Sequence, residues 1–138
     1  MSEVYRIPVG EVMTDRYETV DGMMAVVDGL RKMKRMKAEA LIVDRRHEGD
    51  EYGIVLLSDI ARKVLAQDRA ADRVNIYEIM SKPVITVDSH MDIRYCARLF
   101  DRFGLSYAPV VTNGNLVGIV GYADMVLHGF CAQLKEDE

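Results

Sequence analysis

The chain has little of what several classes of protein require. Its 138 residues include no tryptophan, three prolines and two cysteines, and no apolar run reaches the roughly 18 residues of a membrane span. The N-terminal residues lack the apolar core of a signal peptide, and Cys96 and Cys131 form no metal-type cluster, so we expect reduced thiols and a cytoplasmic location. A net charge of −4 argues against general nucleic-acid binding. The remaining composition, 49% apolar and 29% charged, is typical of a globular protein.

The sequence repeats itself, which has to be recognised before any element is assigned. Three pairs of segments correspond in order: 9–24 with 76–91, 40–44 (ALIVD) with 108–112 (APVVT), and 53–60 (GIVLLSDI) with 118–125 (GIVGYADM). The first copy differs by a longer polar stretch at 45–52, as a hairpin loop tolerates. We therefore divide the chain into residues 1–69, with the N-terminal segment, and residues 70–138, which together form one compact module.

Each copy predicts the order strand, helix, strand, strand, helix. The predicted strands are 18–20, 40–43, 52–57, 84–87, 108–111 and 116–121, and the closing helices are 58–67 and 123–134. Asp21 and Asp88 are suited to capping the first helix of each copy, and Asn113-Gly114 predicts a tight hairpin. The inward helix faces are Val26, Val27, Leu30 and Met33, then Ile93, Cys96, Ala97, Phe100 and Phe103.

These elements predict an α/β protein of the α+β type. Two β-α-β-β-α motifs are expected, related by a pseudo-twofold axis. Because each small sheet has an apolar face that needs cover, we expect the sheets to pack face to face with the helices outside.

The ordered motifs resemble the cystathionine β-synthase (CBS) domain family, and their duplication resembles a Bateman module. The resemblance covers about residues 7–132 and rests on Val12-Met13-Thr14, Ile79-Met80-Ser81, the two Thr-Val-Asp strings, Ala108-Pro109-Val110-Val111 and the two Gly-Ile-Val-x-x-x-Asp strings. It implies a pair of motifs that dimerises into a flat disc, with two clefts that often bind adenine nucleotides or related adenosyl compounds. It implies no catalysis and no required cofactor.

Asp59 and Asp124 stand where a strand passes into a helix. A helix N-terminus favours phosphate, and a carboxylate can accept hydrogen bonds from both ribose hydroxyls. Arg62 and Lys63 share the helix face of Asp59, whereas Asp124 has only His128 at that spacing. The alternative is that both acids merely stabilise helix starts. With the resemblance we favour ribose binding at Asp59, and at Asp124 both interpretations stay open.

The resemblance also implies the rest of each cleft, because one copy's aspartate faces the other copy's first strand. The first cleft would contain Asp59, Ser58, Arg62, Lys63, Pro83, Val84, Ile85, Thr86, Tyr107 and Ala108. The second would contain Asp124, His128, Tyr17, Glu18, Thr19, Glu39 and Ala40. We expect a polyanion to bind better in the first cleft, because the second has more acids and fewer cations.

One departure from the family pattern bears on the ligand. Many nucleotide-binding members have Thr or Ser three residues before the aspartate, where this chain has Leu56 and Gly121. The missing hydroxyl removes a hydrogen bond worth about 0.5–1.5 kcal/mol. Three hypotheses about the ligand therefore stay open: an adenine nucleotide (AMP, ADP or ATP), a less charged adenosyl compound such as S-adenosylmethionine, or no ligand.

Other polar clusters have plainer interpretations. Five cations lie within residues 31–37 (RKMKRMK). They could bind phosphate or RNA, but in an acidic chain we interpret them as a solvated helix face. HEGDE (47–51) is interpreted as a loop and not as a metal site, because adjacent residues in a turn seldom converge on one ion. The serines lack a neighbouring His-acid pattern or nucleophile elbow, so we expect no enzyme activity.

The sequence thus predicts a regulatory module that binds an adenosyl ligand, forms a homodimer and signals to an effector protein that the sequence does not identify. The alternative is a ligand-independent interaction module, with helical faces around Val64-Leu65 and Met125-Val126-Leu127 that dimerise or dock. Neither hypothesis involves a membrane or nucleic acid.

Overall fold

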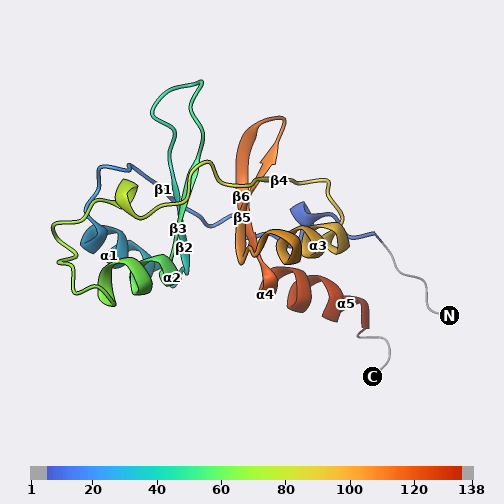
Figure 1. The fold of residues 1–138 in the computed structure, drawn as a ribbon. Coiled ribbons are helices and arrows are strands. Elements are labelled where there is room, and N and C mark those ends of the chain that lie inside the picture. Colours follow the sequence, from blue (N-terminus) through green and yellow to red (C-terminus); the bar gives the residue numbers. More distant parts are fainter. Residues whose placement is uncertain (1–5, 135–138) are drawn as a thin grey trace. The chain divides into compact units, whose positions relative to one another are not determined.

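The structure, a computed structural model, describes residues 6–134 (Figure 1). The contacts within the chain define two compact units. We call them the 18–84 unit, and the 85–134 unit, which also includes residues 6–17. Each holds one three-stranded sheet with the same topology, which confirms the mixed α/β class and the predicted element order.

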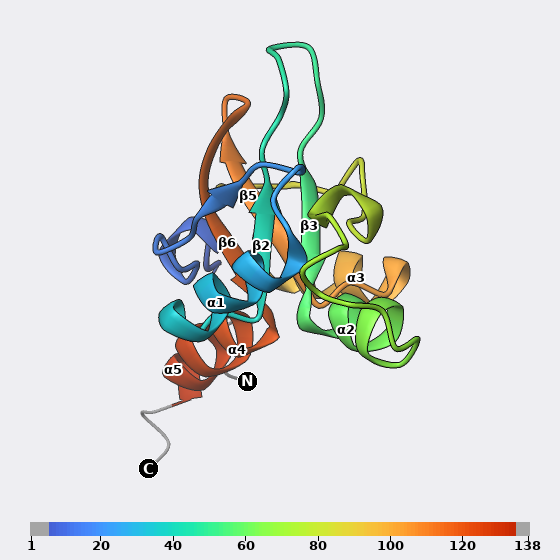
Figure 2. The same cartoon turned by 90° about the vertical axis from the view of Figure 1, so that its left-hand side faces the viewer.

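The sheet of the 18–84 unit has the order β1-β2-β3, with β1 parallel to β2 and β2 antiparallel to β3. In Figure 2 the helices α1 and α2 lie at the opposite end of β2 and β3 from the long 44–52 loop. The elements are β1 (Thr19–Val20), α1 (Val26–Met36), β2 (Ala40–Val43), β3 (Gly53–Leu56), α2 (Leu57–Ile60), which continues into a π-helical turn (Ala61–Leu65), and a 3-10 turn (Ile76–Glu78).

The 85–134 unit repeats this topology with the order β4-β5-β6. No helix in either unit, within residues 6–134, is long and apolar enough to cross a membrane. The elements are a 3-10 turn (Val9–Glu11), β4 (Val87–Asp88), α3 (Ile93–Phe103), β5 (Tyr107–Thr112), β6 (Asn115–Gly121), α4 (Tyr122–Met125), a π-helical turn (Val126–Phe130) and α5 (Cys131–Leu134).

Local chemistry explains most of the element ends. Asn113 and Gly114 have φ angles of 52° and 79°, as the predicted tight hairpin requires. The prediction that Asp21 and Asp88 cap these helices was wrong: each accepts a hydrogen bond from the main-chain N–H two residues further on, and each helix begins five residues after its aspartate. Asp92 is the N-cap of α3, where its carboxylate accepts the Arg94 N–H.

Each unit has its own apolar core. Val26 and Met33 are buried in the first, and Cys96 and Phe100 in the second, on the helix faces that the sequence predicts. Phe103 is the exception, because its side chain at the end of α3 is 55% exposed. The cores hold β2 and β3, and β5 and β6, in fixed register, and so position the strand ends that carry Asp59 and Asp124.

The opening segments of the two copies are exchanged between the units. Thr14, from the first copy, pairs with Ile119 of the second through two main-chain hydrogen bonds of 3.0 Å. Ser81, from the second copy, pairs with Ile54 of the first at 2.9 and 3.0 Å. The units therefore divide after residues 17 and 84, at positions different from the repeat-based division after residue 69.

The glycine of each Gly-Ile-Val string makes this pairing sterically feasible. A Cβ on Gly118 would lie 2.8 Å from the Thr14 carbonyl oxygen, and one on Gly53 would lie 3.2 Å from the Ser81 carbonyl oxygen. The repeated glycine therefore admits the opening segment of the other copy.

Candidate functional site

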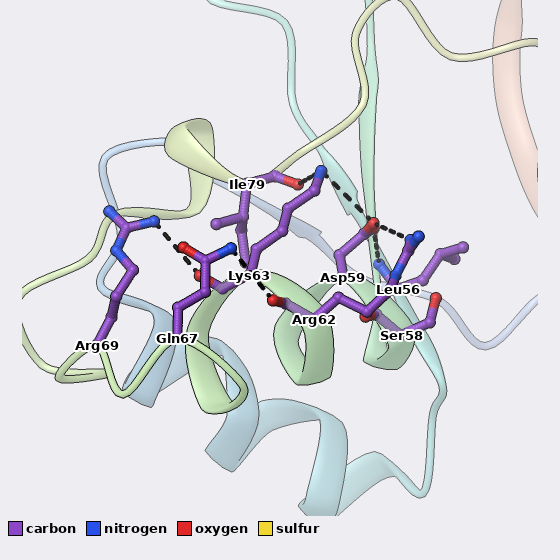
Figure 3. Close-up of polar contacts among 8 residues, drawn as sticks. All are labelled: Leu56, Ser58, Asp59, Arg62, Lys63, Gln67, Arg69 and Ile79. Atoms are coloured by element: carbon purple, nitrogen blue, oxygen red, sulfur yellow. Dashed lines mark hydrogen bonds and ion pairs between the residues drawn. The ribbon is translucent and has the colours of Figure 1, made fainter.

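Asp59 is placed by the passage from β3 into α2. Its side chain is almost fully buried, and Oδ2 accepts the main-chain N–H of Leu56 at 2.9 Å (Figure 3). This bond caps the helix, because the acid at the third helical position accepts an N–H that the helix itself leaves unpaired. The helix-stabilising role considered from the sequence is therefore real at Asp59, and it uses one carboxylate oxygen.

The other oxygen of Asp59 faces two cations. Oδ1 lies 3.4 Å from Nη2 of Arg62 and 3.7 Å from Nζ of Lys63, as the helical spacing predicts. Lys63 is also held by the 3.0 Å hydrogen bond that it donates to the Ile79 carbonyl oxygen (Figure 3). The Arg62 side chain is 70% exposed, so its guanidinium can contact a further anion without losing a buried partner.

Asp124 repeats the main-chain geometry with weaker electrostatic support. Its Oδ2 accepts the Gly121 N–H at 2.8 Å, and its Oδ1 lies 3.8 Å from Nδ1 of His128. Burial raises the pKa of the Asp124 carboxyl above its ordinary value, while the Gly121 N–H and His128 act in the opposite direction. The two aspartates therefore share one capping role but differ in their charged neighbours.

The remaining residues expected in the first cleft are drawn from both units. Ser58 is exposed beside Asp59, and Pro83 and Val84 end the 18–84 unit, where the Val84 N–H donates to the Tyr52 carbonyl oxygen at 3.1 Å. Ile85, Thr86, Tyr107 and Ala108 belong to the 85–134 unit; Tyr107 begins β5 and Ala108 is fully buried.

The second expected cleft is likewise drawn from both units. Tyr17 belongs with Asp124 and His128 in the 85–134 unit, where its hydroxyl donates to the Leu116 carbonyl oxygen at 3.1 Å. The 18–84 unit contains Glu18, Thr19, Glu39 and Ala40. Glu18 is paired with Lys32 at 2.6 Å, and this hydrogen bond lowers the pKa of its carboxyl.

A hollow of about 500 Å³ in the 18–84 unit was missed by sequence reasoning. It lies around the ends of β1 and β2, at the other end of the sheet from Asp59, and is lined by Asp21, Gly22, Met23, Val43, Asp44, Arg46, Asp50, Tyr77, Met80 and Lys82. Its charges are partly satisfied internally, because Asp50 contacts Lys82 at 2.8 Å and Arg46 at 3.7 Å. No motif signals this hollow, since its lining comes from several separate loops.

The acidic HEGDE loop contributes no recognisable metal site. Within residues 6–134, no group of three or more His, Cys, Asp or Glu side chains could hold a metal ion.

The doubled sheet topology, the paired aspartates and the glycine-mediated docking of each opening segment define a duplicated CBS-type protein. The chain belongs to the CBS domain family in its tandem form, and the family model for the CBS domain matches residues 76–128.

Two relatives align with most of the chain. An uncharacterized protein of Methanopyrus kandleri, MK0525, is 32% identical over 87% of this chain, which spans 61% of that protein's length. The CBS domain-containing protein YhcV of Bacillus subtilis is 26% identical over 87% of this chain and 84% of its own length.

Solved structures match the fold over most of the chain. The hexameric CBS-CP12 protein from bloom-forming cyanobacteria is 34% identical, with a TM-score of 0.89 over 95% of this chain and 79% of its own. The CBS domain pair of protein MJ0100, solved in complex with 5′-methylthioadenosine and S-adenosyl-L-methionine, is 25% identical, with a TM-score of 0.80 over 94% and 99% of the two chains.

Proposed function

We propose that this CBS pair is a regulatory module that binds an adenine nucleotide or a related adenosyl compound between its two motifs. The observation that carries the proposal is the similarity to the CBS pair of MJ0100, which binds two adenosyl compounds and aligns with nearly the full length of both chains. The aspartate geometry supports it, because the Oδ1 atoms of Asp59 and Asp124 are not used to cap the helix.

In this proposal Asp59 accepts hydrogen bonds from the ribose hydroxyls. The segment from Val84 to Thr86, just before β4, would offer main-chain groups to the adenine edge, with Tyr107 beside the ring. Ala108, expected beside the ring, is buried in the core of the 85–134 unit and offers no side-chain surface to a ligand. The Asp124 cleft, with Tyr17 and Thr19, would be the second position.

Signalling requires that the ligand bind one arrangement of the module better than another. We propose that the ligand changes the relative geometry of the motifs or of the two chains in a homodimer, and that an effector protein detects the change. The module itself performs no catalysis in this proposal and acts in the cytoplasm.

Isothermal titration calorimetry with AMP, ADP, ATP and S-adenosylmethionine tests the proposal. Asp59→Asn is the informative variant, because its amide oxygen can still accept the Leu56 N–H while the carboxylate charge is lost. We expect saturable binding of at least one compound and about tenfold weaker binding to Asp59→Asn, which corresponds to about 1.4 kcal/mol.

The matched control is Asp28→Asn, which removes a carboxylate from the exposed face of α1 in the same unit. It should bind like the wild type. Saturable binding that is equal in wild type, Asp28→Asn and Asp59→Asn would refute the assignment of Asp59, and no binding of any compound would refute the ligand-sensing function.

A second candidate function is a ligand-independent interaction module. It is favoured by the exposed apolar side chains of the C-terminal helical segment: Tyr122, Val126, Leu127, Phe130 and Leu134 are each 44–61% exposed. The sequence predicted two helical faces for docking, Val64-Leu65 and Met125-Val126-Leu127. Val64 and Met125 are buried in the cores, so only Leu65, Val126 and Leu127 are exposed to a partner. Sedimentation of wild type and Phe130→Glu distinguishes the functions: ligand-independent dimers that Phe130→Glu dissociates would favour this candidate.

A further inference from the structure

The two capping aspartates carry different residues three and four positions further along the helix. After Asp59 these positions hold Arg62 and Lys63, both within 4 Å of its Oδ1. After Asp124 they hold Leu127 and His128. Since the main-chain geometry is the same in both units, these positions set the electrostatic difference between the two sites.

At Asp59 two permanent cations face one carboxylate, so the local charge is positive. A bare carboxylate would repel a ligand phosphate, and Arg62 and Lys63 offset that repulsion. The Lys63 side chain is 40% exposed and that of Arg62 70%, so both can also contact a ligand. A guanidinium is well suited to phosphate because its N–H groups can donate two parallel hydrogen bonds.

At Asp124 the local charge is negative unless His128 is protonated. No arginine or lysine forms an ion pair with Asp124 within residues 6–134, and Leu127 at the third following position is 61% exposed. Burial raises the pKa of the Asp124 carboxyl, and the Gly121 N–H and His128 lower it. A phosphate would meet repulsion here, whereas an uncharged or cationic group would meet an apolar side chain and a carboxylate.

We propose that the two aspartates divide adenosyl ligands by charge: Asp59 binds 5′-phosphorylated adenosine, and Asp124 binds adenosyl compounds that carry no phosphate. This inference rests on the proposed adenosyl-binding function and assigns a ligand class to each position. The class at Asp124 contains thioethers such as 5′-methylthioadenosine and sulfonium compounds such as S-adenosylmethionine.

Calorimetry on the full chain with AMP and, separately, with 5′-methylthioadenosine tests the assignment. We expect Asp59→Asn to weaken only AMP binding and Asp124→Asn to weaken only 5′-methylthioadenosine binding. Arg62→Gln/Lys63→Gln should weaken AMP binding about tenfold and leave 5′-methylthioadenosine binding unchanged. Raising the salt concentration should weaken only the AMP titration.

A gain-of-charge variant keeps the test independent of the structural bond between Lys63 and Ile79. Leu127→Arg/His128→Lys changes two exposed side chains, so the fold should be retained, and it should add a second AMP site. Leu65→Arg, at an exposed position outside both helix pairs, is the matched control and should add none.

The inference is refuted if AMP binding is unchanged in Arg62→Gln/Lys63→Gln. It is also refuted if Asp124→Asn abolishes AMP binding while Asp59→Asn retains it. Either result leaves the proposed function intact, because adenosyl binding would still occur. If the wild type binds neither compound nor any other adenosyl ligand, the proposed function fails and this inference fails with it.

Discussion

Tyr107 and Gly121 face each other across β5 and β6, and a Cβ on Gly121 would lie 2.5 Å from Cε1 of the Tyr107 ring. In the other unit the corresponding pair is Ala40 and Leu56, so the large side chain lies on the opposite strand. This exchange explains why the 85–134 unit has no Thr or Ser three residues before its aspartate: the tyrosine ring occupies the space that the side chain would need.

Gly121→Ala should therefore destabilise the protein by about 1–3 kcal/mol, through overpacking against Tyr107. Backbone conformation is not the cause, because the φ of Gly121 is −134°, which any residue adopts. Urea unfolding of Gly121→Ala, Tyr107→Ala and the double variant measures the coupling, and we expect the alanine at 121 to cost much less when Tyr107 is absent. If Gly121→Ala lowers the free energy of unfolding equally with Tyr107 present and with Tyr107→Ala, the two residues are not in contact.

The sequence predicts the local architecture well because local patterns determine it. The apolar spacing identifies α1 and α3, and Asn113-Gly114 identifies the β5–β6 hairpin. The same patterns do not determine which copy's opening segment pairs with which glycine. Thr14 and Ser81 stand in nearly equivalent strings, so the choice of partner depends on non-local packing that periodicity does not encode.

The candidate site was predictable to a similar degree. The i, i+3 and i, i+4 spacing correctly places Arg62 and Lys63 beside Asp59, because a helix brings those positions to one face. The sequence did not predict that one carboxylate oxygen of Asp59 caps the helix while the other faces the two cations, because the capping bond depends on the angle at which β3 enters α2. The hollow near Asp50 escaped prediction because loops distant in the sequence form it.

The pair of Asp50 and Lys82 should make stability depend on pH in the acid range. The Lys82 ammonium, together with main-chain N–H groups, holds the pKa of the Asp50 carboxyl well below its usual range. As the pH falls, the unfolded chain therefore takes up this proton first, at about pH 3.9. The stabilisation is complete above about pH 5 and is lost progressively in more acidic solution.

Lys82→Met removes the main cause of the shift. Its free energy of unfolding should be lower than that of wild type at neutral pH, and the difference should narrow as the pH falls toward 3. Urea unfolding at several pH values measures this. Arg31→Met, which removes a solvent-exposed ion pair with Asp28, is the control and should show little difference at any pH. If Lys82→Met lowers the free energy of unfolding by the same amount at every pH, Lys82 is not the cause of the lowered Asp50 pKa.

The two cysteines should differ sharply in reactivity. Cys96 is fully buried in the core, and burial raises the pKa of its thiol to about 11, whereas Cys131 is exposed on α5. At pH 8 about one Cys96 thiol in a thousand would be ionised, and the reagent could not reach it. Titration with a disulfide reagent should therefore detect one fast thiol in the folded protein and two after denaturation. In Cys131→Ser the fast reaction should disappear, and a fast native reaction in that variant would overturn this expectation.

The two repeat glycines should tolerate alanine unequally. A Cβ on Gly118 would lie 2.6 Å from Sδ of Met13 and 2.8 Å from the Thr14 carbonyl oxygen, so the main-chain bridge between Thr14 and Ile119 must move. On Gly53 the corresponding contacts, Sδ of Met80 and the Ser81 carbonyl oxygen, are 3.0 and 3.2 Å, and the thioether can shift.

We therefore expect Gly118→Ala to cost about 1–3 kcal/mol of folding free energy and Gly53→Ala less than that. Gly49→Ala is the matched control, because a Cβ there would approach nothing closer than 3.7 Å. Thermal and urea unfolding of the three variants gives the ranking. A Gly118→Ala protein as stable as Gly49→Ala would show that the opening segment does not dock against this glycine, and the exchange of opening segments between the repeats would then be wrong in the 85–134 unit.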